Sequence, residues 1–110
     1  MSRLATLSSL IRFEAPIGDL KAAVASLSWD ADPVVTLTRR DIAYVLERFA
    51  DGEIAAVAVE EWANLVECRE DIQYEPGHEE IISESIHDLA NPLLGGRLPA
   101  IAPNILSRLR

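Results

Sequence analysis

The sequence predicts an all-α protein, a compact helical bundle of four main amphipathic helices plus a short C-terminal helix. Three observations predict this fold class. The chain has 110 residues, of which 49% are hydrophobic, and this fits a single domain over 1–110. Apolar residues recur at helical spacing in four intervals of the chain. The six prolines separate these intervals, because proline breaks the interior of a helix.

The first two predicted helices lie before the middle of the chain. The first spans about 17–28, where apolar residues recur at i, i+3, i+7 and i+10: Ile17, Leu20, Val24 and Leu27. The second spans 39–51. Thr38 and Asp41 have the spacing of a capping box at its start, and Gly52 suits the left-handed turn that ends many helices.

Two further long helices and a short one are predicted after Gly52. The third spans about 55–70, with an apolar face of Val59, Trp62, Leu65 and Val66. Arg69 lies at the edge of that face, and we expect its side chain to reach a carboxylate along the core boundary. The fourth spans about 78–90 and buries Ile81, Ile82, Ser85, Ile86 and Leu89. A tail helix is predicted over 103–109, with Pro103 in its first turn.

Two short runs near the N-terminus have the composition of β-strands. They are residues 10–13 and 34–37. These runs can pair as a minor ribbon, although an isolated two-stranded pair is marginal unless it packs on something else.

The negative charge is concentrated in the middle of the chain. The net charge of −8 comes from 18 acidic and 10 basic residues. Residues 1–40 carry +1, residues 41–90 carry −12 and residues 91–110 carry +3. Two interpretations stay open. The acidic block is either a solvated surface that keeps the protein soluble or a docking face that steers a basic partner.

The composition argues against several classes of function. An acidic chain lacks the positive field that supplies most non-specific affinity for DNA or RNA, so no nucleic-acid partner is expected. The single cysteine, Cys68, cannot form an internal disulfide and favours a reducing, cytoplasmic location. The longest apolar run, 54–59, is far shorter than the ~20 residues that span a bilayer, so we expect no membrane partner and no export signal.

The residue patterns of metal and catalytic sites are incomplete. Glu84 and His87 form a Glu-x-x-His pair, the spacing of helical di-iron sites, but His87 points away from the apolar stripe of its predicted helix and no second pair is suitably placed. Cys68 with His78 or His87 suggests a thiol nucleophile and its base, but nothing identifies an oxyanion hole or a third group. We therefore expect no enzyme activity, no catalytic residue, no metal and no cofactor.

The segment after the third predicted helix is the strongest candidate for a binding site. It reads Asp71-Ile72-Gln73-Tyr74-Glu75-Pro76. A tyrosine among carboxylates is typical of a binding hot spot, since Tyr74 offers contact area at a low entropic cost while Asp71 and Glu75 select a cationic partner. The alternative is that Tyr74 only packs over the ends of the helices.

Residues 36–91 resemble the immunity proteins that neutralise DNase-type colicins and pyocins. The shared features are a capped helix beginning at Thr38, an acidic second helix, an element at 71–76 similar to that family's Asp-x-x-Tyr-Tyr-Pro, and a final amphipathic helix. The resemblance implies a four-helix bundle and an acidic inhibitor that binds a basic nuclease beside its active site. It implies Tyr74 as the anchor and Asp71 as its acidic neighbour. The preceding helix would set specificity through Glu60, Glu61, Asn64, Glu67 and Cys68.

Two functions follow as hypotheses. In the first, the chain is a non-enzymatic binding protein whose acidic helical face, centred on Tyr74, caps a basic partner such as a nuclease toxin. In the second, it is a structural or self-associating domain whose charge serves solubility. Its homodimer interface would then bury Trp29, the pair Leu93 and Leu94, or the tail at 101–109.

Overall fold

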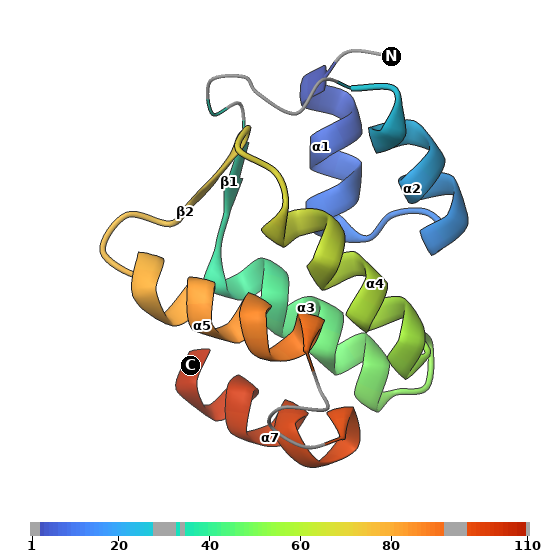
Figure 1. Cartoon of the computed structure of the whole chain (residues 1–110). Helices are drawn as coiled ribbons and strands as arrows, with labels where there is room; N and C mark the ends of the chain where they lie inside the picture. The colour runs from blue at the N-terminus through green and yellow to red at the C-terminus, as the bar shows by residue number, and fades with distance from the viewer. Residues whose placement is uncertain (1–2, 28–32, 34, 92–96, 110) are drawn as a thin grey trace.

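The computed structural model describes residues 3–27, 33, 35–91 and 97–109. This part of the chain is mostly helical, as predicted, and measures 36 × 31 × 22 Å, with the two short strands on one side between α1 and α5 (Figure 1). It contains six helices rather than the predicted five. The elements are, in order, α1 (Arg3–Arg12), α2 (Ile17–Ala25), β1 (Val35–Leu37), α3 (Arg39–Ala50), α4 (Ala56–Glu67), β2 (Ile72–Tyr74), α5 (Glu79–Ala90) and α7 (Leu98–Leu109).

The β-like run predicted at 10–13 is wrong, because these residues end helix α1. Leu7, Leu10 and Ile11 recur at i, i+3 and i+4 and are buried together, and this burial outweighs the local β preference of a short apolar run. Phe13 then leaves the helix with a φ of 53°, in the left-handed region. Arg48 Nη1 donates to the Phe13 carbonyl at 2.9 Å, which supplies a partner for a part-buried backbone carbonyl just after the end of the helix.

The short ribbon exists, but its partners differ from the prediction. Residues 35–37 form β1, and Val34 lies outside the described residues. β1 pairs in parallel with β2, so that Val35 lies opposite Ile72 and Leu37 lies opposite Tyr74. Parallel strands need a long crossover connection, and helices α3 and α4 provide it. The pair therefore connects the start of α3 to the segment that contains Tyr74.

The predicted capping box is confirmed at the start of α3. The Asp41 amide donates to Thr38 Oγ1 at 3.3 Å, and the Thr38 amide donates to Asp41 Oδ2 at 2.9 Å. The first four backbone amides of a helix have no partner within the helix. These reciprocal bonds supply side-chain partners for two amides at the start of α3. Gly52, at a φ of 83°, follows the last turn as predicted.

Replacing Thr38 with alanine should lower the free energy of unfolding by about 1 kcal/mol, because the Asp41 amide loses its side-chain acceptor and keeps only the Thr38 carbonyl. Urea denaturation followed by circular dichroism measures this. Thr36→Ala is the matched control, since the Thr36 hydroxyl accepts a hydrogen bond from the exposed Gln73 side chain and caps no helix. Equal losses in the two variants would contradict the capping role of Thr38.

The other predicted helices are confirmed with small differences at their ends. The expected spans 39–51, 55–70 and 78–90 correspond to α3, α4 and α5. The expected span 17–28 corresponds to α2, although Ser28 lies outside the described residues. None of the helices in the described part of the chain is long and apolar enough to cross a membrane.

The tail helix α7 begins five residues earlier than predicted. Leu98, Ala102, Ile105 and Leu109 recur at i, i+4, i+7 and i+11 and are buried against α3 and α5, so the helix continues through Pro103. These four residues pack within the same chain, so the homodimer surface that the sequence suggests for this tail would rest on its partly buried residues, Ile101 and Leu106. Trp29, Leu93 and Leu94 lie outside the described residues.

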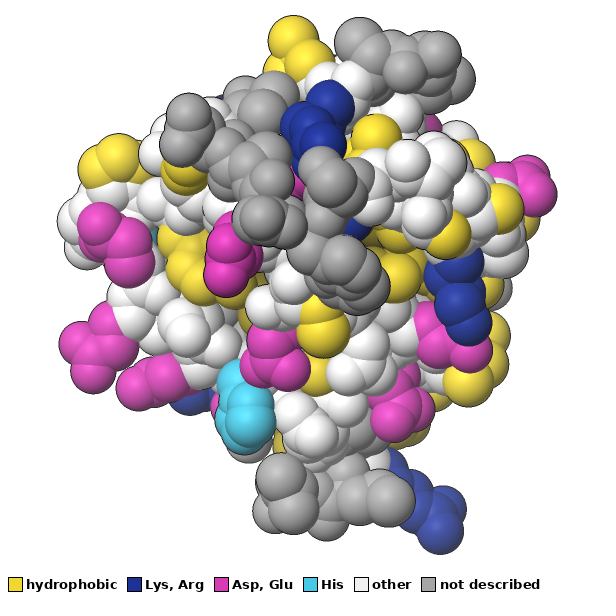
Figure 2. Space-filling view, turned by 45° about the horizontal axis from the view of Figure 1, so that its top comes forward, with side chains coloured by type: hydrophobic (Ala, Val, Ile, Leu, Met, Phe, Trp, Pro, Cys, Tyr) yellow, Lys and Arg dark blue, Asp and Glu magenta, His cyan; other side chains and the backbone are white. Residues whose placement is uncertain are grey.

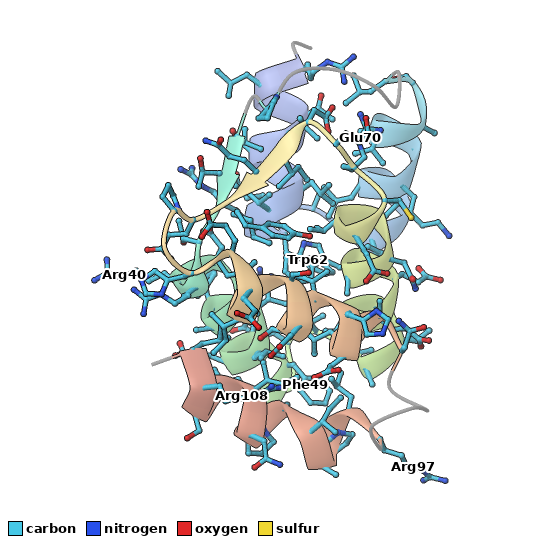
Figure 3. The ribbon with its side chains drawn as sticks, turned by 60° about the vertical axis from the view of Figure 1, so that its left-hand side comes forward. Arg40, Phe49, Trp62, Glu70, Arg97 and Arg108 are labelled. Atoms are coloured by element: carbon cyan, nitrogen blue, oxygen red, sulfur yellow. The ribbon has the colours of Figure 1, made fainter. Side chains whose placement is uncertain are left out.

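The core is centred on Trp62 of α4, which is fully buried. Figure 3 shows this side chain in the middle of the helices. Its indole Nε1 donates to the Leu10 carbonyl at 2.6 Å, and its ring lies 6.4 Å from the Phe13 ring. Trp62 therefore joins the N-terminal helix to α4, the helix that positions the candidate site.

Candidate functional site

Tyr74 is held at the end of strand β2, with part of its ring packed on the core. It lies opposite Leu37, which is fully buried, while the Tyr74 side chain is only half-buried. Burial raises the pKa of the Tyr74 hydroxyl, and the negative charge of Glu67 raises it further. Tyr74 therefore keeps its proton at neutral pH. Strand pairing holds its backbone, while part of its side chain is open to solvent.

Glu67 acts on Tyr74 through its charge and contacts helix α5 through its side chain. It is the last residue of α4, and its Oε2 lies 3.1 Å from His87 Nδ1 on α5. Both side chains are exposed, so solvent screens their attraction and the contact contributes little to stability. The two residues are 20 apart in the sequence, and no local spacing pattern reveals their contact.

The exposed side of α4 carries two more of the predicted site residues. Glu60, Asn64 and Glu67 recur at i, i+4 and i+7 and so share one face. Asn64 Nδ2 donates to the Glu60 carbonyl at 3.1 Å. We call Glu60, Asn64, Glu67, Tyr74 and His87 the Tyr74 surface. It brings together four of the seven residues predicted to contact a partner, and adds His87.

Asp71 lies beneath this surface rather than on it. Its side chain is fully buried. Its carboxylate accepts hydrogen bonds from Arg69 Nε at 3.0 Å and Arg69 Nη2 at 2.7 Å, and it also pairs with Arg3 of α1. The hydrogen bonds from Arg69 lower the pKa of the Asp71 carboxyl, as do those from Arg3. The prediction that Asp71 contacts a partner is therefore wrong, because its side chain is buried. The prediction that Arg69 reaches a carboxylate is confirmed.

The Glu75 side chain is hydrogen-bonded to the first residue of helix α3. Its Oε1 accepts from the Arg39 amide at 3.1 Å and from Arg39 Nε at 3.2 Å. The bond from the amide and the bond from the side chain both lower the pKa of the Glu75 carboxyl. The Glu75 amide in turn donates to the Leu37 carbonyl at 3.0 Å, which extends the β1–β2 pairing. Asp71 and Glu75 thus fix the chain on either side of Tyr74.

Glu61 and Cys68 lie on the other edge of α4, facing α2. Glu61 is 3.9 Å from Lys21 of α2. Cys68 is a free, exposed thiol. The residues that the sequence predicts as one specificity surface therefore lie on two sides of α4. Glu61 contacts α2, whereas Glu67 contacts α5.

Many of the acidic side chains of residues 41–90 are paired within the molecule. Those that form an ion pair are Glu53, Glu61, Glu67, Asp71, Glu75, Glu84 and Asp88. Within the described segments, Asp51, Glu60, Glu70, Glu79 and Glu80 have no ion pair. On the face shown in Figure 2, acidic side chains are separated by uncharged and hydrophobic ones. The acidic block is therefore a set of dispersed carboxylates on this face.

Glu84 and His87, which have the Glu-x-x-His spacing, contact different residues. Glu84 lies 3.8 Å from Arg108 of α7, while His87 contacts Glu67. Among the residues that the structure describes, no group of three or more His, Cys, Asp or Glu side chains is arranged to hold a metal ion.

Comparisons of this chain with protein-family models, with curated proteins and with solved structures found no match.

Proposed function

We propose that this chain is a non-enzymatic binding domain that caps a basic protein partner with its Tyr74 surface. The observation that carries the proposal is the position of Tyr74, which is half-buried, firmly held at its base and next to the exposed carboxylate of Glu67. Tyrosines of this kind dominate many protein interfaces, because they provide contact area with little loss of conformational entropy. The resemblance to nuclease immunity proteins supports a toxin's nucleic-acid-binding site as the partner surface.

The supports around Tyr74 reduce the cost of binding. Asp71 is tied to Arg69 and Arg3, and Glu75 is tied to Arg39, so the segment between them is ordered before any partner arrives. A preorganised contact loses less entropy on association than a flexible loop does. In this proposal, the two buried or half-buried acids act as positioning residues, and Tyr74 makes the contact.

The unpaired carboxylates supply attraction at longer range. Glu60, Glu70, Glu79 and Glu80 have no cationic partner in the described part of the chain. These carboxylates are part of the net charge of −8, and their field favours encounter with a basic surface. A cytoplasmic location suits the proposal, since an exposed free thiol such as Cys68 persists in a reducing compartment.

Tyr74→Ala should weaken binding of the partner about 30-fold or more, the effect of losing a hot-spot residue. The partner is first captured from an extract of the native host, identified and purified, and the binary complex is then measured by surface plasmon resonance. Tyr44→Ala is the matched control, because Tyr44 is the other tyrosine of the chain and lies exposed on α3. We expect its affinity to stay within about threefold of the wild type, as is usual for residues outside a hot spot.

The salt dependence of the same complex tests the electrostatic half of the proposal. The association rate should fall steeply as salt increases, because exposed charges are screened within about 10 Å at 0.1 M ionic strength. A captured partner that is acidic, an association rate independent of salt, or equal effects of Tyr74→Ala and Tyr44→Ala would each overturn the proposed function.

A further inference from the structure

The Tyr74 surface includes a histidine, His87, in direct contact with one of its carboxylates. His87 belongs to the last turn of α5, and its Nδ1 lies 3.1 Å from Oε2 of Glu67 on α4. The His87 side chain is 58% exposed, so its ring is open to solvent and to a partner. Glu67 in turn acts on Tyr74 through its charge. The charge of His87 therefore acts on the same carboxylate that lies beside the tyrosine.

The other ionisable groups around His87 belong to α5 and to the elements packed on it. Helix α5 packs against α4, α7 and β2. The ionisable residues that these elements present around His87 are Glu60 and Glu67 of α4, Tyr74 of β2, Arg108 of α7, and Glu80, Glu84 and Asp88 of α5 itself. Arg108 lies 3.8 Å from Glu84 and 3.2 Å from Asp88, so two carboxylates hold this cation. Glu67 is the carboxylate that His87 contacts directly.

The charge of the Tyr74 surface depends on whether His87 is protonated. A histidine side chain changes its charge between pH 5 and pH 8. Apart from the contact with His87, neither Glu60 nor Glu67 has a cationic partner in the described part of the chain. A neutral His87 leaves both carboxylates available to a cation of the partner. A protonated His87 forms an ion pair with Glu67 and so cancels one of these two charges.

A bound partner strengthens the effect of this proton. In the free protein both side chains are exposed, and solvent screens their charges. A protein that covers the Tyr74 surface excludes water from it, and charges interact more strongly at a lower effective dielectric constant. A cationic side chain of the partner then competes with protonated His87 for Glu67, and the two positive charges repel each other.

We propose that His87 is a pH-sensing residue of the Tyr74 surface, which holds a basic partner at neutral pH and releases it under mildly acidic conditions. This inference rests on the proposed function and adds the regulation of the same site. Binding of the partner and protonation of His87 are linked, so each disfavours the other. A partner that binds at neutral pH therefore excludes the proton from His87, and a proton taken up from solvent at lower pH weakens the complex.

The affinity of the complex should fall with pH in the wild type and not in a variant without this histidine. The probe is the purified partner of the Tyr74 experiment, measured by surface plasmon resonance at about pH 7.5 and about pH 5.5. The wild type should bind about tenfold more weakly at the lower pH. His87→Gln removes the titrating group, and its affinity should change less than about twofold. His87→Lys is positively charged at both pH values and should bind about tenfold more weakly than the wild type at the higher pH.

His78→Gln is the matched control, because His78 is the other histidine of the chain. It precedes the first residue of α5, whereas His87 lies in the last turn of that helix. This variant should keep the pH dependence of the wild type. The partner is the same throughout, so its own titration cancels in the comparison. Calorimetry in two buffers at about pH 6.5 gives a second readout, since binding should release fewer protons in His87→Gln than in the wild type.

The outcomes separate this inference from the proposed function. Equal pH dependence in the wild type and in His87→Gln would overturn the inference, while the Tyr74→Ala variant would still decide the proposed function. Weak binding of His87→Gln at both pH values would make His87 a structural support for Glu67 and would also overturn the inference. If no basic partner is captured, the proposed function fails and this inference fails with it.

Discussion

Asp71→Asn should lower the free energy of unfolding by about 3 kcal/mol, because removing the negative charge of a buried ion pair takes away the attraction that offsets the cost of burying the positive charge. Arg69 is the charge at risk, since only 3% of its side chain is exposed and it donates two hydrogen bonds to Asp71. The hydrogen bond from Arg3 to Asp71 is weakened as well, and with it the contact between α1 and the residue that precedes β2. Urea denaturation at pH 7 measures the loss. Glu70→Gln removes the adjacent exposed carboxylate and should change stability by less than about 0.5 kcal/mol.

The Asp71 effect should also depend on pH in a defined direction. The folded-state pKa of Asp71 lies below its usual value of 3.8, so its contribution is fully present above that value. The contribution is lost as the pH falls through the lowered folded-state pKa. The stability gap between the wild type and Asp71→Asn should therefore be constant from neutral pH down to about pH 5 and narrow below about pH 4. A stability difference that widens as the pH falls would contradict a lowered pKa of Asp71 in the folded protein.

Trp62→Ala should lower the free energy of unfolding by about 4 kcal/mol, within the range found for large aromatic residues in cores. The side chain is fully buried between elements from both halves of the chain, and alanine leaves a cavity that the surrounding helices fill only in part. Circular dichroism is the appropriate measurement, because the other tryptophan, Trp29, complicates fluorescence. A loss below about 1 kcal/mol would show that Trp62 is not central to the core.

Trp62→Phe separates packing from hydrogen bonding. It keeps most of the ring but removes the bond from Nε1 to the Leu10 carbonyl. That carbonyl still accepts from the Phe13 amide at 3.1 Å, so it is not left without a partner. We expect a loss of about 1 to 2 kcal/mol, from the hydrogen bond and the smaller ring together. A loss as large as that of Trp62→Ala would assign the effect to the bond rather than to packing.

The helices with a clear apolar period were predictable from the sequence. Thr38 and Asp41 marked the start of α3 because a capping box is a local pattern, and the spacing around Trp62 marked α4. Helix α1 was missed, since its stripe of Leu7, Leu10 and Ile11 ends in a run that resembles a strand. The partner of β1 was missed because parallel pairing joins segments far apart and leaves no local signal.

The candidate site shows the same division. Glu60, Asn64 and Glu67 were predictable as one exposed helix face, because helical periodicity places them together. The burial of Asp71 was not predictable, since its partner Arg3 is 68 residues away. The same holds for Glu75 and Arg39, which are 36 residues apart. The residues next to an acidic residue are the same whether its carboxylate faces solvent or forms a buried ion pair, so the local sequence does not distinguish the two cases.

The parallel pairing of β1 and β2 also determines when Tyr74 reaches its place during folding. The helices form from local contacts, whereas the pairing joins positions such as Thr36 and Gln73, which are 37 residues apart. Closing such a loop loses chain entropy before any contact compensates for it, so these long-range contacts form late. The bond between Arg3 and Asp71 spans a still longer separation. The binding surface is therefore completed only when these two distant parts of the chain meet.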